Sequence, residues 1–526
     1  MKLDRLTDAE LAAILGALLF ALAAWPIPLL DVPPYQDLAG HMATATIIAN
    51  PELYPEFVFN GFLKTNATLI VWLVFVGKVV GAKWAAKSFV LLTLAANAFV
   101  FPRFVLQLTD RRRMLVASVF LMPMIHNWWV SMGMLNFALS IPLALELLVR
   151  LDRQRAAPSV LRGFAVVLLS LLTWLTHSIP LLIVSFLVAM HVVLRPTWRE
   201  RWADARSLAL PLLPAFALVA LVMMRHVMGT ASVNAGVVET IEFEPPAWEL
   251  YDTWAKWFYG FTPLSASSVV TAVGLAVLAV RGARGAAAPV RLLSLPATLA
   301  LLLALFLLPY VLPGFGYVNM RVLPFVWMAA LVRVPASLPS PAIGLFALAG
   351  LLSSAGMAID LFRVEKDSRE FVAGIDAVPE GARLLTLNFR RRKTSKNTWS
   401  LHTSSGLYVV AKHTSAQDIW ADSPTMPIMH ATPPDALSDP VRVRRFVDAM
   451  QTRERFCAVL ESEGVALTDC DRRWREQWEA FWQSATPRFD HVLMWQATPD
   501  ALGLVPSTYR TVFDRDGLRI LARADQ

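Results

Sequence analysis

The stretch Asp31-Val-Pro-Pro-Tyr-Gln-Asp37-Leu-Ala-Gly-His41 follows directly on an apolar run that covers residues 9–30. A helix of about 20 apolar residues is long enough to cross a bilayer. If this run crosses the membrane, Asp31 emerges at the far surface, and Asp37 and His41 follow within one or two helical turns. The two prolines within the stretch end the first helix before these residues. The sequence therefore predicts two acids and a histidine at one membrane surface.

The composition indicates an integral membrane protein. Of the 526 residues, 56% are hydrophobic and only 17% are charged, and the mean hydropathy is +0.50. Soluble domains rarely have such a composition. The net charge of +8 lies mostly in short loops, as the positive-inside rule expects, and does not call for a nucleic-acid partner. The first apolar run has no small-residue cleavage site, which favours a retained span over a signal peptide.

The arrangement of charges between the apolar runs predicts the topology. Arginine-rich connections at 110–113, 150–155 and 195–202 are expected on the cytoplasmic side. The parity works only if one early apolar run does not cross. Residues 66–81 are the natural omission, because this run is short and contains Lys78, which suits a helix lying in the membrane interface. About eleven spans remain, with the N-terminus inside and the C-terminus outside, at residues 9–30, 84–108, 115–128, 135–150, 161–176, 178–194, 207–228, 263–280, 291–312, 321–334 and 341–359.

This topology gathers polar residues at the outer face. The first outer loop covers about 31–83, and shorter turns follow at 126–136, 176–178 and 313–321. Four of the nine histidines fall at this face: His41, His126, His177 and His226. A longer loop at about 229–262 mixes acids and aromatic residues and is a candidate lid.

The composition changes at about residue 360. We expect a transmembrane domain over 1–359 and an extracytoplasmic α/β or α+β domain over 360–526. Within the second domain, residues 509–521 predict a hairpin that turns at Asp516-Gly517. Residues 388–435 are expected to form a long mobile loop. Cys457 and Cys470 do not have metal-ligand spacing, and they form one disulfide if the domain is extracytoplasmic.

Asp37 and His41 are the first candidates for chemistry, with Asp31 beside them. Asp37 and His41 are four residues apart, so they share one face of a helix that begins near Asp37. A histidine next to a carboxylate serves as a coupled acid and base or as a metal-ligand pair. The structural alternative is that Asp37 only caps the next helix.

A second group of candidates lies in the later outer turns. Arg321, preceded by Asn319, starts a span from the outer face, where a guanidinium can hold a lipid phosphate. The alternative is an arginine that reaches the interface along its aliphatic stem. His177, His126 and Asn136 are candidate binding residues facing the same cavity, and the alternative for the histidines is a cap at a helix end.

Three short motifs resemble a known superfamily: Asp37-Leu-Ala-Gly-His41-Met-Ala, Gly133-Met-Leu-Asn136-Phe137 and Tyr317-Val-Asn-Met-Arg321. Together with the first acidic loop, the interfacial helix and about eleven spans before an outer domain, they resemble the GT-C superfamily. Its members are membrane glycosyltransferases that use polyprenyl-phosphate sugars, and the chain is similar to uncharacterised bacterial proteins of this type. The resemblance implies that Asp37 or Asp31 is the catalytic base and that Arg321 holds the lipid phosphate. Several members have acids in the second outer loop, where this chain has His126, Asn127 and Asn136.

The resemblance implies transfer of a sugar from a polyprenyl-phosphate donor to an acceptor at the outer face of the cytoplasmic (inner) membrane. The acceptor is a lipid, a glycan or a protein. Asp37 and His41 are candidate ligands for a divalent cation, Mg²⁺ or Mn²⁺, at that site. The alternatives are a transporter or export component for a glycolipid or polysaccharide, and a non-catalytic envelope scaffold. Against a transporter, the spans have almost no charge near the membrane centre.

Overall fold

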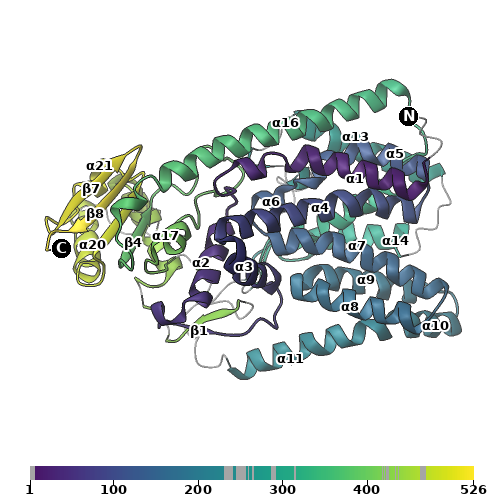
Figure 1. The fold of residues 1–526 in the computed structure, drawn as a ribbon, viewed down its shortest axis with the longest axis horizontal. Coiled ribbons are helices and arrows are strands. Elements are labelled where there is room, and N and C mark those ends of the chain that lie inside the picture. Colours follow the sequence, from purple (N-terminus) through teal and green to yellow (C-terminus); the bar gives the residue numbers. More distant parts are fainter. Residues whose placement is uncertain are drawn as a thin grey trace.

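The computed structural model describes residues 6–229, 241–243, 256–258, 260–262, 266–285, 292–312, 315–417, 419, 421, 426–432, 434–435, 437–462 and 469–525. Two parts are visible in Figure 1: a long bundle of helices and a smaller C-terminal part that contains a sheet at one end of the bundle. The N-terminus and α10 (Trp198–Leu208) lie at the other end of the bundle (Figure 1). The basic connection at 195–202 therefore lies at the same end as the N-terminus, as the positive-inside pattern predicted.

A helix occupies each of the eleven predicted spans. By length and composition, six helical segments of the described chain are long and apolar enough to cross a membrane. The helices at the other five predicted spans do not belong to this group. Helix α7 (Leu135–Ala156) carries more charge than these six segments, and the remaining four helices are shorter. The chain is a multi-pass α-helical membrane protein, as predicted. Its bundle consists of α1 (Asp8–Ala24), α4 (Ala82–Leu108), α5 (Arg111–Ile125), α7 (Leu135–Ala156), α8 (Val160–Thr176), α9 (Ser178–Val193), α11 (Leu213–Gly229), α13 (Ala266–Gly285), α14 (Leu295–Leu307), α15 (Leu323–Leu331) and α16 (Ser340–Phe371).

The segment between α1 and α4 contains two further helices and a short strand. They are α2 (Leu38–Ala49), β1 (Phe57–Phe59) and α3 (Ala67–Val80). The helix α3 coincides with the run that was predicted not to cross the membrane. It begins after Asn66, which has a left-handed backbone, and it ends at Gly81, whose φ of 81° few other residues adopt. The chain therefore turns sharply at both ends of α3.

The C-terminal part is built on a mixed sheet with the order β4-β6-β8-β7. The strands β4 (Leu384–Asn388) and β6 (His491–Trp495) are parallel. The strands β7 (Tyr509–Arg515) and β8 (Leu518–Arg523) form the predicted hairpin, and both turn residues, Asp516 and Gly517, have positive φ. Helices α18 (Pro440–Met450), α19 (Arg453–Ser462) and α20 (Cys470–Ala485) complete the part, and a disulfide between Cys457 and Cys470 joins α19 to α20.

Three connections join the C-terminal part to the bundle. Helix α16 continues past the predicted boundary at residue 359 and ends at Phe371, close to the sheet (Figure 1). Strand β5 (Ile428–His430) pairs with β1 of the first outer loop. Helix α17 (Gly406–Lys412) packs on α2 so closely that a Cβ on Gly406 would lie 2.4 Å from the carbonyl oxygen of Ala39. The prediction of one long loop over 388–435 is therefore wrong, because this segment contains a helix and a strand that pack on the first outer loop.

Candidate functional site

Asp37 lies buried at the start of α2, with 8% of its surface exposed. It stands at the N-cap position, but its side chain makes no capping hydrogen bond to the helix. The carboxylate is therefore not used in the way that the structural alternative proposed. A buried carboxylate without a capping role needs another explanation.

The turn at residues 126–136 packs closely against the backbone of Asp37. Gly133 has a φ of 76°, and a Cβ built on it would lie 2.6 Å from the Asp37 nitrogen. The backbone nitrogen of Gln36 also donates to the Ser131 carbonyl oxygen at 3.4 Å. Glycine is required at residue 133 both for its backbone conformation and for this close approach.

The C-terminal part holds the same stretch from another side. The Thr403 hydroxyl donates to the Gln36 carbonyl oxygen at 2.8 Å and accepts from the Gly40 nitrogen at 3.0 Å. The backbone nitrogen of Trp399 donates to Gln36 Oε1 at 2.8 Å. Two distant segments of the chain, 131–133 and 399–403, thus fix the backbone around Asp37.

The surroundings of Asp37 change its acidity. Burial raises the pKa of Asp37 to about 7. A hydrogen bond with Gln36 and the positive charges of Arg321 and Arg444 act in the opposite direction. The carboxyl group is therefore poised to take up and release a proton near neutral pH.

Arg321 is the positive group of this site, and it is 6% exposed. Its guanidinium donates to His177 Nε2 at 2.8 Å and to the Gly316 carbonyl oxygen at 3.1 Å. It also lies over the rings of Trp129 and Phe137, at 5.4 and 5.0 Å from their centroids. Among the described residues, no carboxylate lies within salt-bridge distance of it, which is unusual for a buried guanidinium. The snorkelling alternative does not fit, because the charged end is enclosed.

His177 joins two helices and orients Arg321. It is the C-cap of α8 and the N-cap of α9, and its Nδ1 accepts from the Ile179 nitrogen at 3.2 Å. The other ring nitrogen, Nε2, accepts from Arg321. His177 therefore caps a helix end, as the structural alternative expected, and it also contacts Arg321, while its role in binding stays a prediction.

His126 lies beside a cavity at the edge of the site. Its Nε2 is 3.2 Å from the Tyr35 hydroxyl, and the Tyr35 ring stacks on Phe261. The cavity has a volume of about 230 Å³ and is lined by residues of α1, α5, α13 and α16, among others. Asp37 and Arg321 do not line this cavity, so it is separate from the site that they form.

Other predicted site residues have contacts that explain them structurally. Asp31 forms an ion pair with Lys83 at 2.8 Å and is about half exposed. Asn136 donates to the Asn66 carbonyl oxygen at 2.7 Å and accepts from the Leu69 nitrogen at 2.9 Å, so it holds the start of α3. The amide of Asn319 donates to the Leu305 carbonyl oxygen and accepts from the Met320 nitrogen.

His41 is buried one turn after Asp37, and its backbone nitrogen donates to the Asp37 carbonyl oxygen. Among the described residues, no three His, Cys, Asp or Glu side chains are grouped to hold a metal ion. The positive charges that act on Asp37 are those of Arg321 and Arg444. The residues present therefore do not fit a divalent cation held by Asp37 and His41. The side chain of His226 and most of the candidate lid at 229–262 lie outside the described residues.

The sequence did not reveal how several other residues position the site. Gly133 opens one of the three short motifs, but its close approach to Asp37 was not predicted, although a glycine within a short polar turn often marks such an approach. Trp399 and Thr403 were not singled out, because they act by holding the backbone and side chain of Gln36 and the backbone of Gly40.

No protein-family model matches the sequence, and no curated protein matches it. A search of solved structures finds the crystal structure of ArnT from Cupriavidus metallidurans in the apo state, with a TM-score of 0.55 and 11% sequence identity. The match covers 98% of this chain and 98% of that chain. ArnT is a GT-C glycosyltransferase. The chain therefore has the fold of that structure over almost its whole length, which agrees with the fold that the resemblance to the GT-C superfamily implied.

Proposed function

We propose that the protein transfers a sugar from a polyprenyl-phosphate donor to an acceptor hydroxyl at the outer face of the cytoplasmic membrane. The observation that carries the proposal is the buried pair of Asp37 and Arg321. A buried arginine without a carboxylate within salt-bridge distance favours an anionic ligand, and a lipid phosphate supplies that charge. The shared fold with ArnT supports the reaction class.

In the proposed reaction, Asp37 accepts the proton of the acceptor hydroxyl. The hydroxyl oxygen then forms a bond with the anomeric carbon of the donor sugar, and the bond between that carbon and the phosphate oxygen breaks. Polyprenyl phosphate leaves with the bonding electron pair, and Arg321 stabilises its negative charge. His177 holds the guanidinium in position for this role.

The outer-face placement is part of the proposal. The disulfide between Cys457 and Cys470 supports it, because structural disulfides form outside the cytoplasm. The position of the basic α10 at the opposite end of the bundle supports the same orientation (Figure 1).

The test is turnover of polyprenyl-phosphate sugars by the purified protein, compared with Asp37→Asn and Arg321→Ala. We expect release of polyprenyl phosphate that Asp37→Asn abolishes while the protein remains folded and inserted. Retained transfer in Asp37→Asn would overturn the assignment of the base. Donor binding that depends on Arg321 without turnover would favour the transporter alternative, and no binding would favour the scaffold.

A further inference from the structure

A basic pocket lies in the C-terminal part, apart from the Asp37–Arg321 site. It has a volume of about 670 Å³. Trp399 and a single carboxylate, that of Asp448, also line it. Its six cationic side chains are Arg390, Arg391, Arg392, Lys393, Lys396 and Arg455.

Only two of these cations are neutralised. Arg391 pairs with Asp448, and Lys393 pairs with Glu370 of α16. Within the described part of the chain, the other four form no ion pair with a carboxylate, and all four are exposed. Several like charges around one hollow repel one another, and a bound anion relieves that repulsion.

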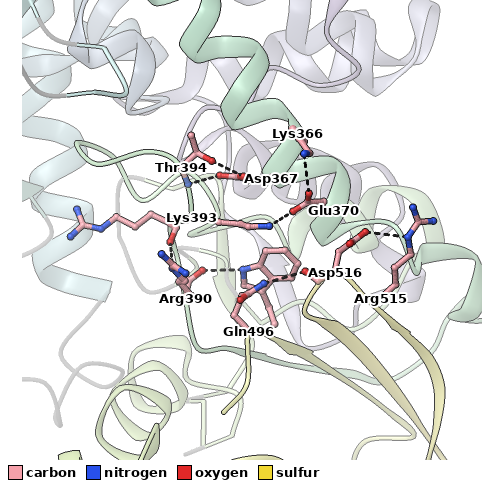
Figure 2. A network of polar contacts seen from close by, with 11 residues as sticks. Lys366, Asp367, Glu370, Arg390, Lys393, Thr394, Gln496, Arg515 and Asp516 are labelled. Atoms are coloured by element: carbon pink, nitrogen blue, oxygen red, sulfur yellow. Dashed lines mark hydrogen bonds and ion pairs between the residues drawn. The ribbon is translucent and has the colours of Figure 1, made fainter. Parts of the chain in front are cut away.

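The segment that carries the pocket is firmly held. Thr394 donates to the Asp367 carboxylate through its nitrogen at 2.7 Å and its hydroxyl at 2.9 Å, and Lys393 reaches Glu370 on the same helix, as Figure 2 shows. Ser395 Oγ donates to the Phe261 carbonyl oxygen at 3.0 Å. The cations are thus arranged on a supported backbone, which lowers the cost of ordering them around a ligand.

The pocket is also connected directly to the candidate catalytic stretch. Trp399, which lines the pocket, donates through its nitrogen to Gln36, the residue before Asp37. The ring of Trp399 packs against the Arg391 guanidinium, 5.0 Å from the ring centroid. A group bound in the pocket therefore lies close to the junction between the C-terminal part and the membrane bundle.

We propose that this pocket is a second anion site, which binds a phosphate ester or diphosphate group. One guanidinium group can bind two phosphate oxygens at once. Arg390 and Arg392 each contribute a guanidinium group to the pocket. The phosphate is carried either by a membrane phospholipid or by a soluble molecule. This proposal does not depend on the proposed transfer reaction, because it concerns a different cavity.

The test uses the full-length protein in nanodiscs of phosphatidylcholine, with inorganic pyrophosphate as the probe and calorimetric titration as the measurement. The pocket variant is Arg390→Gln with Arg392→Gln and Lys396→Gln. The matched control is Arg473→Gln with Arg475→Gln and Arg510→Gln, which removes three exposed arginine charges that form no ion pair among the described residues of the same part. Thermal unfolding of each variant checks that it remains folded.

We expect the pocket variant to bind pyrophosphate at least about tenfold more weakly than the wild type, and the control to bind as the wild type does. Equal binding by the pocket variant, or an equal loss in the control, would overturn the proposal. Asp37→Asn should leave pyrophosphate binding unchanged, so that failure of the transfer reaction and failure of this proposal are distinguishable.

A second titration, in nanodiscs of phosphatidylglycerol, distinguishes the two sources of the phosphate. If pyrophosphate binding weakens in the wild type but not in the pocket variant, the lipid headgroup competes for the pocket and is its ligand. If both proteins respond equally to the lipid, the headgroup does not compete for the pocket, and the phosphate is carried by a soluble molecule.

Discussion

Asp37 shows how strongly one residue depends on its surroundings. Its carboxylate is buried, makes no helix cap and has no metal-ligand cluster around it among the described residues. Burial favours its neutral form, whereas Arg321 favours its charged form. A general base needs this balance, since it must be charged before the reaction and neutral after it.

The first prediction concerns pH. The pKa of the Asp37 carboxyl group is raised from 3.8 to about 7 in the folded protein. Between pH 3.8 and about pH 7, the folded protein therefore holds a proton on Asp37 that the unfolded chain has lost. The contribution of Asp37 to the free energy of unfolding is therefore fully present below pH 3.8 and is lost as the pH rises to about 7. The melting temperature of Asp37→Asn minus that of the wild type should be larger at pH 8 than at pH 5. Thermal unfolding of both proteins in detergent measures this difference.

Wild-type transfer activity should rise as the pH increases through about 7, because Asp37 must lose its proton to act as the base. An activity profile that is flat between pH 5 and 8 would contradict this role.

The second prediction concerns Gly133. Gly133→Ala should lower the free energy of unfolding by about 1–3 kcal/mol and reduce transfer strongly, because the added Cβ displaces the backbone of Asp37. The control is Gly81→Ala, which has a similar positive φ of 81° but no atom within 4 Å of its added Cβ. Loss of activity in both variants to the same degree would show that backbone strain alone is responsible.

At the scale of elements, α2 is held between α17 and the second outer turn. Its own sequence is apolar and does not specify where it packs. The contacts with Gly406 and Thr403 decide its position. The element that carries the candidate base is therefore positioned by the part of the chain that lies outside the bundle.

The third prediction tests this arrangement. Thr403→Val keeps the side-chain shape but leaves the Gln36 carbonyl and the Gly40 nitrogen without their partner. We expect a loss of about 1–3 kcal/mol in the free energy of unfolding and a lower turnover rate with little change in donor binding. The control, Thr511→Val, changes an exposed strand residue and should alter neither quantity. Full turnover in Thr403→Val would show that the Thr403 contacts, in the turn before α17, do not position Asp37.

The sequence predicted the elements better than it predicted their contacts. Apolar runs predicted the bundle helices and the helix α3, and Asp516-Gly517 predicted the hairpin, because these signals are local. The interfacial position of α3 stays a prediction. Asp37, Arg321 and His177 were recognised as polar groups at outer helix ends. The roles of Asn136 and Thr403 depend on partners that are distant in sequence, so no local pattern could reveal them.

At the scale of the whole molecule, the C-terminal part and the membrane bundle share one site. Strand β5 pairs with β1, α17 packs on α2, and the basic pocket contacts Gln36. The orientation of the whole chain in the membrane therefore decides which compartment the site faces.

The fourth prediction tests that orientation. In cells, Cys457 and Cys470 should be oxidised and should resist alkylation until a reductant is added. Cys470→Ser should leave the partly exposed Cys457 thiol free to react with a membrane-impermeant reagent after the outer envelope is opened. Free thiols in the wild type, labelled only after the cytoplasmic membrane is broken, would place this part in the cytoplasm.

The bond between Thr403 and Gly40 joins residues that are 363 positions apart in the chain. A ribosome adds about 5–20 residues per second, so the stretch around Asp37 leaves the ribosome on the order of half a minute before its partner does. During that interval the growing chain already lies among the lipids, but its candidate base has not been fixed in place. The candidate site is thus completed late in synthesis, and a product truncated before Thr403 would lack the contacts that fix the stretch around Asp37.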